Sequence, residues 1–319
     1  MIRVGVLRGG TSTEHDVSLS TGEHILSHFK SDKLKDSYTP LDIYIDKSGL
    51  WHSNGLPTTP EQLVHKVDLM INALHGEYGE DGKVQKILDG FQIPYTGSGA
   101  MASAIGFNKA LSKEAFARLG IQTPQHILYP AYQIDFDGPR EEYAIAKAHE
   151  VMRKMPPPYI VKPLTGGSSM GIHVCKTFDE LVRAFRVGVG QNVSILDGFL
   201  GQETCVLPPI EIRLPSEKTH FDYEAKYNGA SEEICPGNFS MGEKEELVRL
   251  ASLIHTGLNL DHYSRSDFIL HPKKGIYAIE VNTLPGLTEQ SLIPKALIAV
   301  GSSMPEFLEH LIARAYPQK

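Results

Sequence analysis

The sequence predicts a mixed α/β (α+β) protein whose amino-terminal part is a doubly wound parallel sheet. Runs of β-branched and other apolar residues alternate with helical patterns along the first hundred residues, which is the order of a parallel sheet with helical crossovers. The length of 319 residues is large for one hydrophobic core, so we expect two or three packed units. Apolar residues at 41% and charged residues at 22% are ordinary for a soluble globular protein.

The first unit is expected to contain strands and helices in alternation before residue 97. The expected strands span 2–7, 41–45 and 68–74, and the expected helices span 16–29 and 82–88. The glycine-containing segments 9–12 and 75–82 each follow one of these strands. Ligands of doubly wound sheets gather at the carboxyl ends of the strands, so both segments are candidate ligand loops.

A second unit is expected to begin near residue 98. Segment 97–102 is compatible with a dinucleotide fingerprint, but it lacks an acidic residue after a following strand, and a strand-to-helix turn explains it better. One long helix is expected over 102–119, carrying Lys109. Residues 159–163 are expected to form a strand that contains Lys162 near its end.

Glycines and serines fill the loop 164–171 after Lys162. The N–H groups and hydroxyls of such a loop can surround a phosphate, and the lysine adds a positive charge beside it. A plain hairpin turn between 160–161 and 172–174 explains the loop equally well, and both interpretations can hold together. The loop lacks the Gly-Lys-Ser/Thr ending of a Walker A loop.

The segment 221–227 is aromatic and charged and has neither a helical nor a strand period, and a turn cluster at 228–231 follows it. Such a segment can be a lid whose tyrosine or lysine reaches a substrate. A plain surface loop is the commoner structure for this composition, so the segment by itself leaves both interpretations open.

Asp267, Glu280 and Asn282 flank an expected hairpin whose strands include 268–270 and 276–279. On adjacent antiparallel strands the three side chains can share one face. Three oxygen ligands on one face suit Mg²⁺, which keeps some of its waters and also contacts phosphate. Taken alone, a solvated hairpin with its charges facing water is the commoner explanation.

The residues around this hairpin favour the metal hypothesis. Arg265, two residues before Asp267, would lie on the same strand face, where a guanidinium can stabilise an oxyanion or a phosphoryl group in transfer. A Pro-Gly turn at 285–286 leads to a helix that is expected to start at Ser291. A helix amino terminus with a serine cap suits a substrate carboxylate.

Charge, cysteine usage and hydropathy argue against several classes of protein. A net charge of −7 and a pI of about 6.1 argue against a nucleic-acid-binding surface, although a local basic site for phosphates stays compatible. The cysteines at 175, 205 and 235 form no C-x₂-C pair, so we expect neither a zinc site nor a disulfide framework, but a reducing cytoplasm. The chain starts with a strand pattern rather than a signal peptide, and no apolar run is long enough for a membrane span.

Four motifs, in this order and spacing, resemble the D-alanine–D-alanine ligase family of the ATP-grasp superfamily. They cover nearly the whole chain and lie at residues 9–18, 75–85, 223–227 and 282–292. Each motif is moderately specific, and the four together are very specific.

The resemblance implies a three-domain ATP-grasp architecture with ATP held between the second and third domains. These would be an amino-terminal substrate-binding domain at 1–97, a central subdomain at 98–192, and a carboxy-terminal subdomain with the metal and catalytic site at 193–319. The implied reaction is the ATP-dependent ligation of two D-alanine molecules through a D-alanyl phosphate, giving D-alanyl-D-alanine for peptidoglycan precursors. ATP and two Mg²⁺ ions, for which Mn²⁺ can substitute, are the implied cofactors, and a homodimer in the cytoplasm is expected.

The resemblance also implies residue roles. Arg265 and the N–H of Gly286 would hold the oxyanion, and Tyr227, Ser168 and Glu14 would form a hydrogen-bonded bridge that closes the lid. The implied substrate-binding residues are Glu14, His75, Ser291 and Leu292. The implied nucleotide-binding residues are Lys109, Lys162, Ser168, Ser169, Glu203 and Lys226, and the implied metal ligands are Asp267, Glu280 and Asn282.

Some positions depart from the family pattern, and two alternatives therefore stay open. Leu196 and Asp197 stand at the expected adenine hinge, Gly166 stands where a charged residue or glutamate is usual, and serines flank Arg265. The alternatives are a related carboxylate–amine or depsipeptide ligase with a different second substrate, and a non-catalytic ATP-binding relative. Tyr227 argues against the lactate-using branch, where a histidine is expected, and the retained Arg265 and metal ligands argue against the non-catalytic relative.

Overall fold

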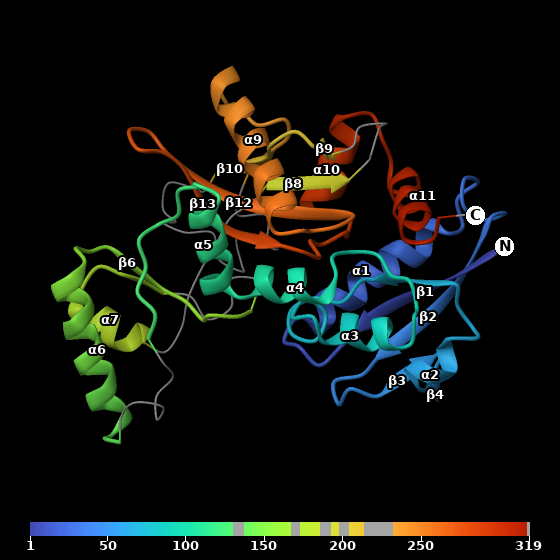
Figure 1. Cartoon of the computed structure of the whole chain (residues 1–319), viewed down its shortest axis with the longest axis horizontal. Helices are drawn as coiled ribbons and strands as arrows, with labels where there is room; N and C mark the ends of the chain where they lie inside the picture. Colours follow the sequence, from blue (N-terminus) through green and yellow to red (C-terminus); the bar gives the residue numbers. More distant parts are fainter. Residues whose placement is uncertain (130–136, 167–172, 186–192, 198–203, 214–231, 318–319) are drawn as a thin grey trace. The chain divides into compact units, whose positions relative to one another are not determined.

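The computed structural model describes residues 1–129, 137–166, 173–185, 193–197, 204–213 and 232–317 of the chain (Figure 1). Its contacts divide the chain into two compact units with separate hydrophobic cores. Unit 1 comprises Met1–Gln122, Gln191–Glu211 and Glu233–Lys319, and unit 2 comprises Thr123–Gly190 and Ile212–Glu232. The three-domain boundaries expected from the sequence remain a prediction.

The strands are β1 (Ile2–Gly9), β2 (Tyr38–Ile45), β3 (Trp51–Ser53), β4 (Leu56–Thr58), β5 (Leu69–Asn72), β6 (Tyr159–Val161), β7 (His173–Cys175), β8 (Val193–Asp197), β9 (Thr204–Val206), β10 (Glu211–Arg213), β11 (Glu232–Ile234), β12 (Tyr263–His271) and β13 (Gly275–Asn282). The helices are α1 (His15–His28), α2 (Pro60–Leu63), α3 (Lys83–Gly90), α4 (Ala100–Phe107), α5 (Lys109–Arg118), α6 (Arg140–Lys154), α7 (Phe178–Ala184), α9 (Met241–Gly257), α10 (Leu292–Ala299) and α11 (Met304–Ala315). Among these helices, none is both long and apolar enough to cross a membrane.

Unit 1 contains a mixed sheet with the strand order β4-β3-β2-β1-β5. β1 pairs in parallel with both β2 and β5, so the predicted α/β fold with a parallel sheet is confirmed. The hairpin of β3 and β4 adds antiparallel strands at one edge, which the sequence did not predict. Each of these two strands has only three residues, too few for an alternating pattern to be recognised.

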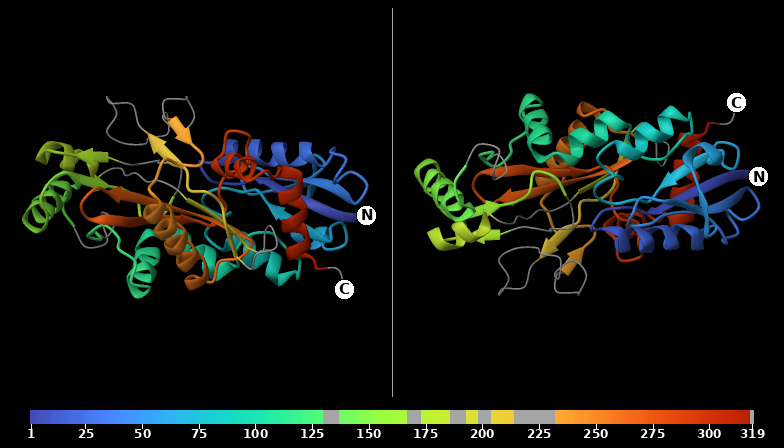
Figure 2. Two further views of the ribbon diagram at one scale, coloured as in Figure 1. Left: turned by 90° about the horizontal axis from the view of Figure 1, so that it is seen from above. Right: turned by 90° about the horizontal axis from the view of Figure 1, so that it is seen from below.

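Helices cover both faces of this sheet, as a doubly wound fold requires (Figure 2). α1 lies close to the face that carries Arg8, because a Cβ atom added at Gly22 would be 2.6 Å from the Cβ of Arg8. α2 and α3 cover the other face, where Leu63 and Leu88 belong to one core with Leu7 of β1.

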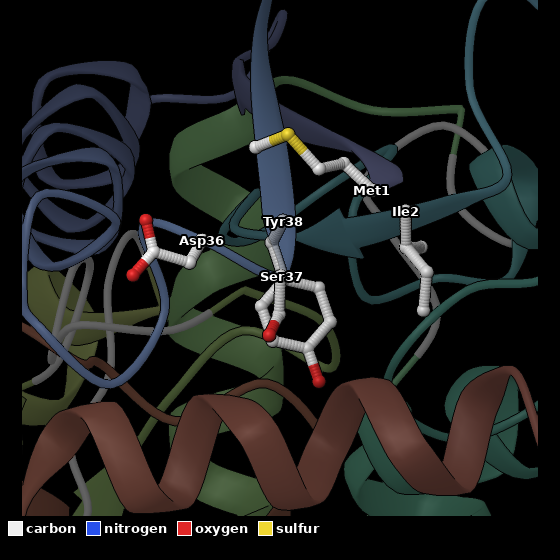
Figure 3. Close-up of a pocket in the computed structure, with 5 residues that line it drawn as sticks. All are labelled: Met1, Ile2, Asp36, Ser37 and Tyr38. Atoms are coloured by element: carbon white, nitrogen blue, oxygen red, sulfur yellow. The ribbon is translucent and has the colours of Figure 1, made fainter.

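The loops that follow β1 and β5 meet at the carboxyl edge of the parallel strands. The hydroxyl of Ser12 donates a hydrogen bond to the carbonyl oxygen of His75 at 2.6 Å. A surface pocket lies instead where β1 and β2 begin (Figure 3). It is lined by Met1, Ile2, Asp36, Ser37 and Tyr38. This pocket is at the opposite end of the strands from the candidate ligand loops and takes no part in the site described below.

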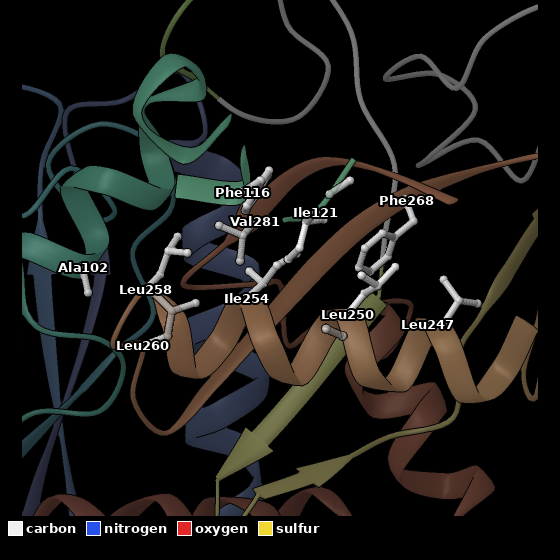
Figure 4. Packing of buried hydrophobic residues seen from close by; sticks show 12 residues of the cluster. Ala102, Phe116, Ile121, Leu247, Leu250, Ile254, Leu258, Leu260, Phe268 and Val281 are labelled. Atoms are coloured by element: carbon white, nitrogen blue, oxygen red, sulfur yellow. The ribbon is translucent and has the colours of Figure 1, made fainter. Parts of the chain in front are cut away.

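A second sheet of unit 1 has the order β13-β12-β8-β9, with antiparallel pairing throughout. α9 packs against it through Leu250 and Ile254 (Figure 4). These side chains belong to one buried cluster with Phe268 of β12, Val281 of β13 and Phe116 of α5. Val281 lies in this core, so its neighbours in β13 at positions 280 and 282 point to the other face.

The single helix expected over 102–119 is wrong, because the structure has two helices there. α4 ends at Phe107 and α5 begins at Lys109, and Asn108 between them is extended with φ −88° and ψ 109°. The side-chain oxygen of Asn108 accepts hydrogen bonds from the N–H groups of Ala110 and Leu111. An asparagine that caps the next helix competes with continuation of the previous one, and this places Lys109 at the first residue of α5.

Unit 2 contains the antiparallel pair β6–β7 with α6 and α7. Tyr159 and Cys175 are register partners and are buried with Ala148 of α6 and Leu181 of α7. The hairpin expected on either side of the glycine- and serine-containing loop is therefore confirmed, and Lys162 follows β6 directly. Residues 167–172 of that loop lie outside the described part of the chain.

Candidate active site

Four side chains of β12 and β13 share one face of the second sheet. The register pairs Arg265 with Asn282 and Asp267 with Glu280. Opposite residues of an antiparallel pair point to the same side, as do residues two apart in one strand, so the four form a compact square. The face that the sequence predicted these residues to share is therefore present.

Asp267 is the most buried member of this square, with only 1% of its surface exposed. Nε of Arg265 donates to its Oδ1 at 3.1 Å, and Nη2 of Arg265 donates to its Oδ2 at 3.4 Å. Nδ2 of Asn282 lies 3.3 Å from the same Oδ2. Groups from two neighbouring strands therefore fix the carboxylate in place.

Arg265 stays positively charged in this environment. Burial alone would lower the pKa of its guanidinium, but the negative charges of Asp267, Glu280 and Glu80 together with the Asp267 hydrogen bond raise that pKa above its usual value. Its side chain is 15% exposed, so it is not fully enclosed. A permanently charged donor that is already oriented by a buried carboxylate suits a site where negative charge develops.

Lys109 adds a second positive charge from the first residue of α5. Its Nζ lies 3.7 Å from Oε2 of Glu280, and the exposed fractions of the two side chains are 13% and 14%. The Asn108 cap fixes where α5 begins and therefore where this lysine leaves the backbone. The square thus has two acidic residues flanked by two cations.

The donor atoms of the square fit a hard divalent cation such as Mg²⁺. Asp267, Glu280 and Asn282 supply carboxylate and amide groups from adjacent strands, and oxygen ligands are those that Mg²⁺ prefers. The Asn282 amide directs its nitrogen toward Asp267, and a half-turn of the amide places its oxygen there instead. Among the described residues, no three His, Cys, Asp or Glu side chains converge on one point, so the amide and waters would complete the ligand set.

Glu14 lies at the carboxyl edge of the first sheet, immediately before α1, and is 8% exposed. Its carboxylate lies beside Gly76, where an added Cβ atom would be only 2.7 Å from Oε2 of Glu14. Gly76 has a φ of +70°, so both its backbone conformation and the close carboxylate require glycine. The N–H of Glu14 donates to Oγ of Ser12 at 3.1 Å, and this hydroxyl also bonds to the 75–82 loop.

His75 lies in a buried polar cluster next to Glu14. Its Nε2 contacts Oγ1 of Thr21 at 2.9 Å, and its Nδ1 lies 3.9 Å from Oε1 of Glu80. Glu80 in turn accepts a hydrogen bond from the N–H of Gly76 at 2.9 Å. Glu80 is 9% exposed and was not predicted as a site residue. Its spacing from His75 in a glycine-containing loop was a visible signal, but only the fold shows that the carboxylate is buried.

Ser291 precedes α10 as the sequence predicted, but its hydroxyl does not cap the helix. It accepts a hydrogen bond from the N–H of Thr288 at 3.1 Å and lies 2.8 Å from the hydroxyl of Thr288. A Cβ atom added at Gly286 would be 2.9 Å from Oγ of Ser291. The turn therefore brings the backbone of Gly286, the hydroxyl of Ser291 and the amino terminus of α10, where Leu292 is the first residue, close together.

Several predicted site residues are not placed relative to this site. Ser168, Ser169, Glu203, Lys226 and Tyr227 lie outside the described residues. Lys162 is half-buried and belongs to unit 2, whereas Glu14, Lys109, Arg265 and Gly286 belong to unit 1. The roles of all these residues remain predictions.

Two family models match the chain. The model described as D-ala D-ala ligase N-terminus matches residues 3–63 and 52–98, and the model described as D-ala D-ala ligase C-terminus matches residues 130–313. Together they cover most of the chain.

Curated relatives and solved structures agree with these matches. A D-alanine–D-alanine ligase of Oleidesulfovibrio alaskensis is 36% identical, and one of Pelotomaculum thermopropionicum is 32% identical, each over 98% of this chain and 96% of the relative. The structure of D-alanyl-alanine synthetase A from Vibrio cholerae is similar with a TM-score of 0.80 and 25% identity over 99% of both chains. The VanG D-Ala:D-Ser ligase from Enterococcus faecalis is similar with a TM-score of 0.78 and 26% identity over 98% of both chains.

Proposed function

Because the chain belongs to the D-alanine–D-alanine ligase family, whose members have the ATP-grasp fold, we propose that the protein joins two D-alanine molecules while ATP is converted to ADP and phosphate. The γ-phosphoryl group passes to a carboxylate oxygen of the first D-alanine, giving D-alanyl phosphate and ADP. The amine of the second D-alanine then attacks the acyl carbon, loses a proton, and phosphate leaves. The product, D-alanyl-D-alanine, is a peptidoglycan precursor.

The observation that carries this proposal is the square of Arg265, Asp267, Glu280 and Asn282. Acidic and amide ligands for Mg²⁺ and a permanently charged arginine lie on one face within one hairpin. Phosphoryl transfer to a carboxylate needs both, because negative charge must be neutralised on the phosphates and on the acyl oxygen. When bound, two Mg²⁺ ions held by Asp267, Glu280 and Asn282 would neutralise charge on the ATP phosphates.

We assign Lys109 and Lys162 to the phosphates of ATP. Lys109 already lies beside Glu280, so its ammonium is positioned next to the proposed metal ligands. Lys162 follows β6 and leads into the glycine- and serine-containing loop, whose backbone N–H groups and Ser168 and Ser169 would contact the same phosphates. Glu203 and Lys226 are assigned to the nucleotide by family resemblance.

We assign the oxyanion of the tetrahedral intermediate to Arg265 and the N–H of Gly286. The Asp267 contacts hold the guanidinium in one orientation, so little reorganisation is needed when the charge forms. Gly286 lies in the turn that ends at Ser291, and a side chain at position 286 would collide with that hydroxyl.

The two substrates are assigned to two loops of unit 1, one before α1 and one before α10. Glu14 would pair with the ammonium of the first D-alanine, with His75 and Glu80 behind it to fix the loop. The hydroxyl of Ser291 and the N–H of Leu292 would bind the carboxylate of the second D-alanine at the start of α10. A bridge of Tyr227, Ser168 and Glu14 would close the site and keep water from the acyl phosphate.

Phosphate release tests the reaction directly. The purified protein is incubated with ATP, Mg²⁺ and D-alanine alone, and in parallel with D-alanine plus D-serine or D-lactate. Release with D-alanine alone supports the proposal. Release only with a mixed pair would show a related ligase with another second substrate, and for D-serine this is the activity that names the similar VanG D-Ala:D-Ser ligase. Absence of release with intact ATP binding would show a non-catalytic relative.

Two substitutions test the metal assignment. Asp267→Asn and Glu280→Gln remove one carboxylate charge each and are expected to abolish turnover while the far-ultraviolet circular dichroism stays unchanged. Raising the Mg²⁺ or Mn²⁺ concentration should restore part of the activity if the loss is one of metal affinity. Normal turnover in both variants would contradict the metal site.

We further propose a homodimer in the cytoplasm. The cysteines at 175, 205 and 235 form no disulfide in the structure, which is compatible with a reducing compartment. Light scattering of the purified protein tests the dimer, and a monomer at all concentrations would contradict it.

A further inference from the structure

Two histidines on α1 face each other beside the proposed substrate turn. His24 and His28 are one helical turn apart, and their Nε2 atoms are 3.2 Å apart. Their rings lie 4.6 Å apart between centroids at an interplanar angle of 80°. Residues at i and i+4 of a helix point the same way, so this contact follows from the regular geometry of α1.

A backbone carbonyl fixes the tautomer of His24. Its Nδ1 lies 2.6 Å from the carbonyl oxygen of Leu287, which can only accept, so Nδ1 carries the proton and donates it. Nε2 of His24 is therefore unprotonated, and its lone pair lies beside Nε2 of His28. In proteins, a histidine that binds a metal usually donates its other ring N–H to such a carbonyl.

The spacing of the two Nε2 atoms matches two ligands of one metal ion. Two nitrogens at about 2.0–2.1 Å from a tetrahedral Zn²⁺ lie about 3.3 Å apart, close to the observed separation. Without a metal, His28 must donate its Nε2 proton to His24. When His28 instead carries its proton on Nδ1, its Nε2 also has a lone pair. A small rotation of the two rings then lets both Nε2 atoms bind one cation in place of the shared proton.

Both histidines are half-buried, so neither residue is sealed from solvent. Among the described residues there is no cluster of three or more His, Cys, Asp or Glu side chains around a single position. The protein would thus supply two ligands, and water would fill the other coordination positions. Two imidazoles and water suit a borderline divalent cation such as Zn²⁺ or Ni²⁺ better than Mg²⁺, which prefers oxygen.

We propose that His24 and His28 form a binding site for one divalent transition-metal ion, separate from the Mg²⁺ site at Asp267 and Glu280. The ion would also hold His24 in the tautomer that donates to Leu287. Leu287 follows Gly286 in the turn that leads to Ser291, so occupancy stabilises this turn. The site does not depend on the proposed ligase function.

Zinc titration of the full chain against a chromophoric chelator tests the site, with excess Mg²⁺ present to saturate oxygen ligands. We expect one Zn²⁺ per chain at this site in the natural protein. His24→Gln and His28→Gln should each weaken that binding by about tenfold or more, because even loss of a partner behind a metal ligand costs about 10–100-fold in affinity. His65→Gln removes an exposed histidine outside the pair and should change nothing.

Equal zinc affinity in the natural protein and His28→Gln would overturn the proposal, as would an equal loss in His65→Gln. Circular dichroism checks that each variant is folded. If a variant is not folded, crystals of the natural protein soaked in Zn²⁺ decide the question. Anomalous density next to both Nε2 atoms supports the site, and its absence there at saturating Zn²⁺ refutes it.

Discussion

Substitution of Arg265 should separate its structural role from its catalytic role. Arg265→Met removes the positive charge and leaves the carboxylate of Asp267, which is 1% exposed, without its two guanidinium hydrogen bonds. Removing one partner of a buried ion pair typically costs about 3–5 kcal/mol, so we expect a loss of that order in the free energy of unfolding. Arg265→Lys keeps a charge beside Asp267 and should lose about 1 kcal/mol, the contribution of a typical hydrogen bond.

Both substitutions should lower turnover strongly. A lysine ammonium cannot form the parallel contacts of 3.1 and 3.4 Å to Asp267 and still present a second N–H to an oxyanion. Loss of one oxyanion donor usually lowers kcat by about 10²–10³-fold, so we expect this loss even in the stable lysine variant.

The double variant Arg265→Met with Asp267→Asn completes the design. It removes the stranded charge, so much of the stability lost in Arg265→Met should return, while turnover stays absent. Urea unfolding gives the stabilities, and phosphate release gives kcat. Turnover within a few-fold of the natural protein in Arg265→Lys would refute the oxyanion role. Full stability in Arg265→Met would refute the argument from the buried ion pair.

Three further predictions concern single positions. Gly76→Ala should raise the KM for the first D-alanine, because the new methyl group would lie 2.7 Å from Oε2 of Glu14. The control Gly55→Ala has a similar positive φ but open space around it, so it should leave KM unchanged. Equal KM values in both variants would contradict the role of Glu14. Ser291→Ala should raise the KM for the second D-alanine by about tenfold to a hundredfold, since a hydrogen bond to a charged group contributes about 1.5–3 kcal/mol, and an unchanged KM in initial-rate kinetics would contradict the assignment. Burial raises the pKa of the Cys175 thiol to about 11. Alkylation of this thiol, followed by mass spectrometry, should therefore be slow at pH 8 and should accelerate as the pH rises toward that value, because only the thiolate reacts. Fast alkylation of the folded protein at pH 8 would contradict this.

The first sheet could be predicted because its pattern is local. The β-branched run of β1 and its alternation with helices are visible in the sequence, and the parallel pairing with β2 and β5 follows from that order. The break at Asn108 could not be predicted in the same way. An asparagine is tolerated inside a helix or caps the next one, and packing around α4 and α5 decides between these outcomes.

The residue types of the candidate site could also be predicted, but their partners could not. The spacing of four residues along an expected hairpin was enough to place them on one face: Arg265, Asp267, Glu280 and Asn282. Side chains alternate between the two faces of a strand, so only a few pairings of the two strands keep the apolar residues on the core face. Glu80 was missed because a carboxylate in a polar loop is usually solvated, and only its burial next to His75 distinguishes it.

The sequence by itself determined the family, the parallel sheet and the chemical nature of the residues proposed for the metal and the oxyanion, because these depend on motif spacing and on periodicities of a few residues. Only the tertiary structure decided which distant groups meet. Lys109 reaches Glu280 because a helix starts anew after Asn108. His24 contacts the carbonyl of Leu287 across 263 residues of chain. Such contacts depend on how whole elements pack, and no local pattern encodes that packing.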